Sequence, residues 1–286
     1  MTHRSWCFRL LELYGTRLPH HRGKWWIHHH LRRLTGLDRL DTELVVQRGG
    51  LRWRLNPRDY AHRDLLWLGV KDRWELWHIR RRLAPGAVIL DVGANFGYYG
   101  IYLAQSLQRR CTVHCLEPHP ETFARLQDNI RLNHLEEVVH PHRLALAEAP
   151  GRARLSENPD NSGAACLATG ACSGPETEID TLDRFCARLG LERLDFLKID
   201  VEGCEERLLA GGLASLRRWR PLISIEVNPP ALAAAGSSPR RVAAWLAALD
   251  YRLMLPRRER LEPLRRLPAG PDYLNLICLP PRQGLG

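Results

Sequence analysis

From residue 87 onward, short apolar runs alternate with longer segments of helical periodicity. The runs predict five buried strands, at 87–91, 112–117, 138–146, 195–200 and 221–227. The periodic segments predict helices at 97–108, 120–133, 203–218 and 239–249. This alternation favours an α/β fold, in which helices cover both faces of a mostly parallel sheet. Two final strands, near 251–255 and 273–279, have no helix between them, so we expect an antiparallel pair at the sheet edge.

The first 80 residues follow a different pattern. Residues 1–40 predict accessory helices, one of which has an apolar face made by Cys7, Leu10, Leu11 and Tyr14. Short strands at 44–46 and 51–55 flank Gly49-Gly50, a pair typical of a β-hairpin turn, and a helical pattern covers 64–83. We therefore divide the chain into an N-terminal region of helices and a hairpin, residues 1–80, and an α/β domain, residues 81–286. Within the latter, residues 156–177 predict a loop or short hairpin.

Composition and charge narrow the class of protein. The 286 residues include 44% hydrophobic and 26% charged side chains, as in a globular protein, and carry a net charge of +10. Basic residues concentrate in residues 1–35 and 252–266, which either form a solvated face or meet a membrane surface, a nucleic acid or an anionic substrate. Because nearly all of them are arginine in a chain rich in Ala and Leu, their number alone does not indicate nucleic acid.

The cysteines and the N-terminal sequence indicate in which cellular compartment the protein is expected. Eight scattered cysteines without a C-x-x-C pair are typical of reduced core thiols rather than of a disulfide framework. Arg4 and Arg9 interrupt the apolar N-terminal stretch, so it lacks the core of a signal peptide, and no apolar run is long enough to span a membrane. We expect a cytoplasmic protein, with peripheral membrane contact through the basic N-terminus as a further option.

The first strand of the α/β domain ends in a glycine-rich turn of the form D-x-G-x-N-x-G, made by Asp91, Gly93, Asn95 and Gly97. Glycine lets the backbone approach a ligand where a Cβ atom would collide, and ligands of such sheets bind at the carboxyl ends of the strands. An acid at this point repels a diphosphate but suits a ligand that carries ammonium and sulfonium groups. The turn therefore favours S-adenosylmethionine over a dinucleotide.

A second acid follows the next strand, where Glu117-Pro118 ends the run Val113–Leu116. An acid at the end of the second strand can accept hydrogen bonds from both hydroxyls of a ribose. Nicotinamide-binding proteins use a similar spacing, so Glu117 alone does not choose between the two cofactors.

A third group of acids surrounds the end of the fourth strand. Lys198 and Asp200 share one face of the run 195–200, and Glu202-Gly203 follow. Buried charges are costly unless they are paired or functional, so we interpret Asp200 and Glu202 as site residues, with helix capping as the alternative. Glu226 ends the fifth strand. Asn228-Pro229-Pro230 is interpreted as a loop, because the aromatic residue of an N-P-P-[YF] element is missing.

Taken together, these motifs resemble the FkbM family of S-adenosylmethionine-dependent methyltransferases. The resemblance rests on the segments that begin at Asp91, Glu117, Glu178 and Leu197, and it extends more weakly from about residue 50 to the end. It implies a Rossmann-like class I methyltransferase fold with strand order 3-2-1-4-5-7-6 and an antiparallel last strand. It also implies methyl transfer, usually to a hydroxyl group of a sugar, polyketide or similar metabolite.

On this basis we assign roles to the candidate residues. The cofactor-binding set is Asp91, Gly93, Asn95, Gly97, Glu117, Pro118, Ala147 and Glu148, of which the last two border the adenine. The catalytic set is Asp200, Glu202 and Glu226, with one acid as base or as the group that orients the acceptor. Asn161 and Ser162 belong to a loop that covers the acceptor. We assign no metal, although the three catalytic acids could hold a divalent ion.

The expected partner is a hydroxyl-bearing small molecule. Methylation of RNA through the basic surface is the first alternative, although we do not expect nucleic acid as a partner. A cofactor-binding interaction module without catalysis is the second, and the acids at 200 and 202 argue against it. The sequence does not identify the acceptor or the oligomeric state.

Overall fold

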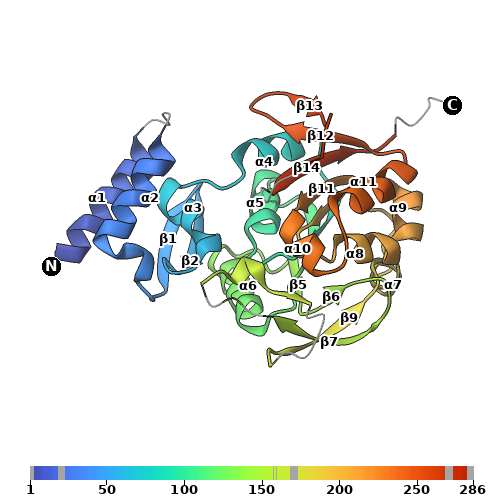
Figure 1. The fold of residues 1–286 in the computed structure, drawn as a ribbon, viewed down its shortest axis with the longest axis horizontal. Coiled ribbons are helices and arrows are strands. Elements are labelled where there is room, and N and C mark those ends of the chain that lie inside the picture. The colour runs from blue at the N-terminus through green and yellow to red at the C-terminus, as the bar shows by residue number, and fades with distance from the viewer. Residues whose placement is uncertain are drawn as a thin grey trace. The chain divides into compact units, whose positions relative to one another are not determined.

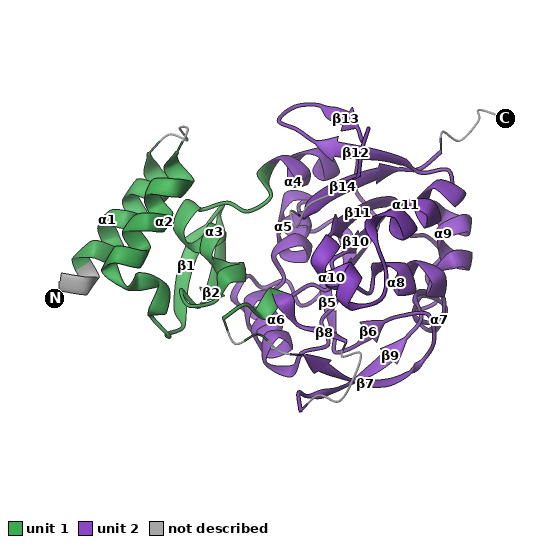
Figure 2. Cartoon of the chain, viewed as in Figure 1, with its two compact units in different colours: residues 1–73, 158–163 green, residues 74–157, 164–286 purple. Residues whose placement is uncertain are grey.

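A computed structural model describes residues 3–18, 23–156, 158, 160–167, 173–267 and 273–281. The chain forms two compact units, shown in different colours in Figure 2. Unit 1 comprises residues 1–73 together with the segment 158–163, and unit 2 comprises residues 74–157 and 164–286. The sequence-based division after residue 80 differs from this one, both in its boundary and in keeping the segment 158–163 with the second domain.

Unit 1 consists of helices and one hairpin. Its elements are α1 (His3–Arg17), α2 (Lys24–Thr35), the 3-10 helix η1 (Leu37–Arg39), β1 (Leu44–Arg48), β2 (Leu51–Leu55) and α3 (Tyr60–Leu68). The predicted hairpin is confirmed: β1 and β2 pair antiparallel. Gly49 and Gly50 both have positive φ, 59° and 79°, as a tight two-residue hairpin turn requires.

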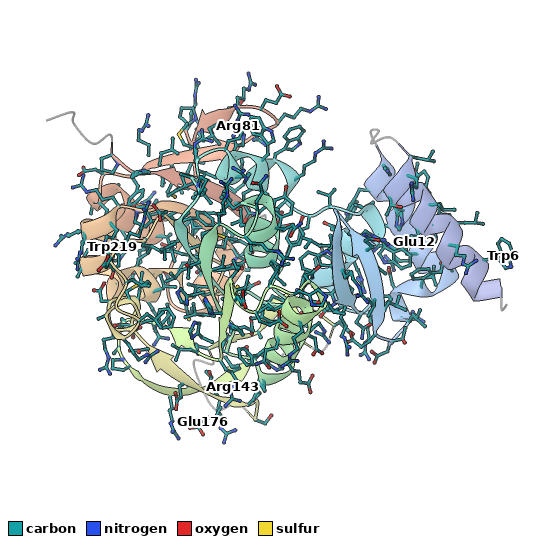
Figure 3. All side chains as sticks on the ribbon, turned by 180° about the vertical axis from the view of Figure 1, so that it is seen from behind. Trp6, Glu12, Arg81, Arg143, Glu176 and Trp219 are labelled. Carbon is teal, nitrogen blue, oxygen red and sulfur yellow. The ribbon has the colours of Figure 1, made fainter. Side chains whose placement is uncertain are left out.

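The predicted apolar face of α1 is only partly correct. Leu11 is buried, but Leu10 is 63% exposed. Gly15 lies on the inner face, where a Cβ atom would come within 1.8 Å of the carbonyl oxygen of Trp67 on α3. Trp6 projects from the N-terminal end of α1 (Figure 3). The inner face is therefore set by a close approach of two helices and not by the largest apolar side chains.

Unit 2 contains an eight-stranded sheet in the order β13-β12-β14-β11-β10-β3-β4-β5. Figure 1 labels β13, β12, β14 and β11, which lie on one side of this sheet. Its strands are β3 (Ala87–Val92), β4 (Cys111–Leu116), β5 (Val139–His142), β10 (Phe196–Ile199), β11 (Leu222–Val227), β12 (Arg252–Pro256), β13 (Leu261–Pro263) and β14 (Leu274–Leu279). Strands β5, β4, β3, β10 and β11 are parallel to one another, whereas β14 pairs antiparallel with both β11 and β12. If β13 is left out and the other seven strands of this sheet are numbered along the chain from β3, their order, starting from β5, is 3-2-1-4-5-7-6.

Helices pack on both faces of this sheet. They are α4 (Arg73–Arg80), α5 (Tyr98–Ser106), α6 (Pro120–Leu132), α7 (Leu182–Arg188), α8 (Glu205–Gly211), α9 (Leu213–Trp219), α10 (Pro229–Ala234) and α11 (Pro239–Ala248). Leu90 and Val92 of β3 pack in one core cluster with side chains of α7, α8, α9 and α11. On the opposite face Gly100 of α5 lies against Val113 and Cys115 of β4. The predicted α/β fold class, Rossmann-like with covered faces, is confirmed.

A second, four-stranded sheet in the order β6-β9-β7-β8 was not predicted. It contains β6 (Ala145–Leu146), β7 (Gly151–Ser156), β8 (Cys166–Leu167) and β9 (Glu176–Asp180), with the 3-10 helix η2 (Ser162–Ala164) between β7 and β8. The predicted strand 138–146 is thus two strands. The stretch 156–177, predicted as a loop or short hairpin, contains β8, which pairs antiparallel with β7, and ends inside β9. β9 alternates exposed Glu176 and Glu178 (Glu176 is labelled in Figure 3) with buried Thr177 and Ile179. Residues 168–172 of that stretch, including Cys172, lie outside the described residues.

Two predicted helices are also interrupted. The pattern over 64–83 breaks at Gly69 (φ 75°) and Asp72 (φ 47°), which end α3 and separate it from α4. The predicted helix 203–218 divides into α8 and α9 at Gly211-Gly212. α4 belongs to unit 2, where buried Glu75 accepts a hydrogen bond from Ser224 of β11 and His78 Nε2 lies 2.8 Å from the carbonyl oxygen of Arg257. These contacts explain why the units divide near residue 73.

Within the described part of the chain, no helix combines the length and the apolar character needed to cross a bilayer.

Candidate active site

The glycine-rich turn after β3 brings the ends of three strands together. The amides of Gly93 and Ala94 both donate to the carbonyl oxygen of Leu116, the last residue of β4, over 3.0 and 2.9 Å. Gly93 has φ 77°, and a Cβ atom on it would lie 1.8 Å from the carbonyl oxygen of Asp200, just after β10. Only glycine fits there, because the backbones of the two strand ends are in contact at this point.

Asp91 is almost completely buried under this turn. Its Oδ2 accepts a hydrogen bond from the amide of Gly100 in α5 over 2.9 Å. Part of its carboxylate therefore serves to fix α5 against β3. Its predicted contact with the ammonium group of a cofactor stays a prediction.

Glu117 lies beside the same turn and is also buried. Its Oε2 accepts from the amide of Asn95 and its Oε1 from the amide of His119, each over 2.9 Å. Asn95 adopts a left-handed conformation (φ 50°) that aims its amide at the carboxylate. Burial raises the pKa of Glu117 to about 7, against the pull of the two amides. A carboxylate can accept about four hydrogen bonds, so this one retains acceptor capacity for two ribose hydroxyls. Pro118, half-buried, follows it directly.

Three carboxylates converge at the carboxyl ends of β10 and β11. Asp200, Glu202 and Glu226 each offer an oxygen atom within 4.8 Å of the others. The two strands are adjacent and parallel, with Ile199 opposite Ile225, which accounts for the convergence of residues distant in sequence. Such a cluster can take up a proton, orient a hydroxyl group or supply oxygen ligands to a divalent cation.

The members of this cluster differ in their partners. Lys198, 2% exposed in the middle of β10, places its ammonium 3.3 Å from Asp200 Oδ2 and 5.0 Å from the ring centre of Tyr99. Glu202 receives a neutral donor, the amide nitrogen of Asn228, over 3.1 Å. Burial, then the negative charges of Asp200 and Glu205, raises the pKa of Glu202 to about 8. A carboxyl group that titrates this close to neutral pH is suited to proton transfer.

Asn228 is a site residue that the sequence interpretation missed. The sequence predicts a loop at this position, because no aromatic residue follows Pro230. In the structure its Oδ1 caps α10 by accepting from the amide of Ala231, which leaves its Nδ2 directed at Glu202. The available signal was the N-cap pattern Asn-Pro-Pro directly after a buried strand.

The residues predicted near the adenine, Ala147 and Glu148, follow β6, and their predicted place beside the adenine stays a prediction. Ala147 follows β6 of the small sheet and is fully buried, and its carbonyl oxygen would lie 2.1 Å from a Cβ atom on Gly211 of α8. Glu148 is half-exposed and pairs with Arg207 of α8, with 2.5 Å between Nε and Oε2. Both were expected directly after the third strand of the main sheet, but they follow β6.

The predicted acceptor residues belong to unit 1. Asn161 lines a cavity of that unit, and the amide of Ser162 donates to Asp59 Oδ1 over 3.2 Å. The other site residues all belong to unit 2. The predicted role of Asn161 and Ser162 in covering the acceptor stays a prediction.

The sequence of this chain is similar to those of known methyltransferases. A family model described as the methyltransferase FkbM domain matches residues 91–253. The 2-O-methyltransferase NoeI of Sinorhizobium fredii is 27% identical over 153 residues, which cover 48% of this chain and 61% of NoeI. The 31-O-demethyl-FK506 methyltransferase FkbM of Streptomyces tacrolimicus is 32% identical over 160 residues, which cover 45% of this chain and 60% of that protein. The chain thus spans about three-fifths of either relative.

A solved structure shows the same fold. The crystal structure of a methyltransferase FkbM from Methylobacillus flagellatus aligns with a TM-score of 0.50 and 15% identity, over 96% of this chain and 58% of that one. The family model covers more than half of the chain, including the turn at Asp91, Glu117 and the three converging carboxylates. The chain therefore belongs to the FkbM family of S-adenosylmethionine-dependent methyltransferases.

Proposed function

We propose that the protein transfers the methyl group of S-adenosylmethionine to a hydroxyl oxygen of a small molecule, such as a sugar or a polyketide. The observation that carries this proposal is the convergence of Asp200, Glu202 and Glu226 beside the glycine-rich turn. The names of NoeI and FkbM, both O-methyltransferases, support the same reaction class.

The chemistry explains why carboxylates suit this reaction. A hydroxyl oxygen must lose its proton as it takes the methyl group, and a positioned base contributes about 10²–10⁴-fold to such a step. Glu202 is the proposed base, because it is the member whose pKa lies near 8 and whose donor, Asn228, is neutral. Asp200, held by Lys198, and Glu226 orient the acceptor hydroxyl.

The cofactor is proposed to lie over the turn. S-adenosylmethionine supplies an activated methyl group on a sulfonium centre. The backbone of Gly93, Asn95 and Gly97 offers the close approach that its amino-acid part needs, and Glu117 accepts the ribose hydroxyls. On this proposal the reacting atoms lie near the ends of β3, β4 and β10.

The decisive experiment uses methyl-labelled S-adenosylmethionine with a fractionated extract of small molecules and, separately, of RNA. We expect label in a small-molecule fraction, on an oxygen atom when the product is analysed by mass spectrometry. Label found only in RNA, or on nitrogen or carbon, contradicts the proposal.

The base is tested with the acceptor so found. The turnover rate should rise about tenfold per pH unit up to about pH 8 and then level off, because only ionised Glu202 takes the proton. Glu202→Gln should lower turnover by about 10²–10⁴-fold and remove this rise. Glu259→Gln, an exposed change of the same kind, is the matched control. A Glu202→Gln variant that keeps both the rate and its pH dependence excludes Glu202 as the base.

A further inference from the structure

Unit 1 contains a cavity of about 680 Å³. Its wall is formed by the end of α2 and η1, the start of α3, and Asn158, Asp160 and Asn161, all within that unit. This volume lies in the range of small-molecule sites, roughly 300–1,000 Å³.

The charge of the wall favours an anion. The lining holds four guanidinium groups, Arg33, Arg39, Arg58 and Arg63, against two carboxylates, Asp38 and Asp160, an excess of two positive charges. Asp160 is engaged by Arg58 Nε over 2.8 Å.

The second carboxylate is engaged as well. Asp38 Oδ1 lies between Arg32 Nε, at 3.5 Å, and Arg63 Nε, at 3.9 Å. Arg33 and Arg39 are exposed, and neither forms an ion pair with any residue that the structure describes. The excess charge is therefore carried by two arginines whose guanidinium groups are available to a ligand.

The rest of the wall is held in place before any ligand arrives. Arg63 Nη2 donates to the backbone carbonyls of Asp38 and Arg58, which ties η1 to the start of α3. The amide of Tyr60 donates to the carbonyl oxygen of Asp160 over 2.9 Å, which ties α3 to the segment 158–163. A wall that is already ordered lowers the entropic cost of binding.

We propose that this cavity binds the phosphate group of a phosphorylated small molecule. Two arginines with unengaged forks suit a dianion, because guanidinium donors match phosphate oxygens in pairs. The remaining volume, lined by the Tyr60 ring and by the polar Asn158 and Asn161, accommodates an organic part such as a sugar or a nucleoside. Asp38 and Asp160 in the wall disfavour a continuous polyanion such as RNA.

The test is calorimetric titration of the full chain with inorganic pyrophosphate and, separately, with UDP-glucose. Arg33→Gln combined with Arg39→Gln should weaken the binding of both probes by about tenfold or more. Arg240→Gln combined with Arg258→Gln removes the same charge from two exposed arginines of unit 2 and should leave the affinity unchanged. A higher salt concentration should weaken binding to the parent chain. Circular dichroism establishes that each variant is folded.

Several results overturn the proposal. It fails if neither probe binds at millimolar concentration, or if the Arg33/Arg39 variant binds as tightly as the parent. Vesicles containing phosphatidylglycerol and a 20-nucleotide RNA are tested as competing ligands. The proposal also fails if one of these binds and pyrophosphate does not displace it, since the ligand is then a lipid surface or a nucleic acid. The titration contains no methyl acceptor, so its outcome is independent of the proposed methyl transfer.

Discussion

Replacing Glu117 tests two things at once: how the stability of the folded protein depends on pH, and how tightly the protein binds its cofactor. Burial raises its pKa from 4.5 to about 7. Between these two pH values, Glu117 is therefore mostly protonated in the folded protein and mostly ionised in the unfolded chain. The folded state is therefore stabilised by this group at pH below 4.5. That stabilisation is lost as the pH rises toward and through 7.

The size of the effect follows from the two pKa values. Protonation linkage with pKa values of 4.5 and about 7 makes the wild-type folding free energy about 2.5 kcal/mol less favourable at pH 8 than at pH 5, from this residue alone. Glu117→Gln removes this dependence. The amide side chain can accept from Asn95 or His119 but not from both, so one buried donor loses its partner at about 1–3 kcal/mol. We expect the variant to be less stable than wild type at pH 5 and about equally stable at pH 8.

The assay is urea unfolding of both proteins at pH 5 and pH 8, following the transition that S-adenosylhomocysteine shifts, because that transition reports the unit that binds it. At pH 8 the variant should bind S-adenosylhomocysteine about tenfold more weakly or worse, since the ribose hydroxyls lose a charged acceptor. Glu259→Gln is the control. A stability difference that does not change with pH refutes the raised pKa of Glu117. An unchanged affinity refutes its role at the ribose.

Two further predictions concern the fold around the site. Gly93→Ala should destabilise unit 2 by more than about 2 kcal/mol in urea unfolding, because the new Cβ atom would lie 1.8 Å from a backbone oxygen, at φ 77°. Gly86→Ala has a similar φ of 85° but open space around it, so it should cost about 1 kcal/mol. If Gly93→Ala destabilises the protein no more than Gly86→Ala does, the close contact between the two strand ends is contradicted. His114 and His142 have their pKa lowered to about 4, mainly by burial, so stability should fall as the pH drops from 6.5 toward 4, and His142→Phe should lessen that fall in acid unfolding curves.

The parallel sheet was predictable because its signals are local. β3, β10 and β11 are short runs of mostly apolar, buried residues, and the helices between the strands have a period of their own. The four-stranded sheet was missed because its strands are short and partly polar. β9 reads Glu-Thr-Glu-Ile-Asp, and only its alternating burial against β7 identifies it as a strand.

The helix breaks were less predictable for a different reason. Gly211 and Gly212 lie inside a helical pattern, where a glycine is tolerated at moderate cost. The break follows from a tertiary contact, since a Cβ atom on Gly211 would meet the carbonyl oxygen of Ala147. Periodicity carries no information about this approach of α8 to the end of β6. The departure of the segment 158–163 to unit 1 depends in the same way on tertiary bonds, such as that from the amide of Tyr60 to Asp160.

The acids of the candidate site were found from the sequence, but their division of labour was not. Asp200 and Glu202 are two residues apart, and both follow a buried strand, so sequence position gives no reason to prefer either as a base. The structure separates them by their contacts: Asp200 lies 3.3 Å from the ammonium group of Lys198, whereas Glu202 accepts a hydrogen bond from the neutral amide of Asn228. Burial raises the pKa of Glu202 to about 8, so this carboxyl must lose its proton before it can accept one from a hydroxyl.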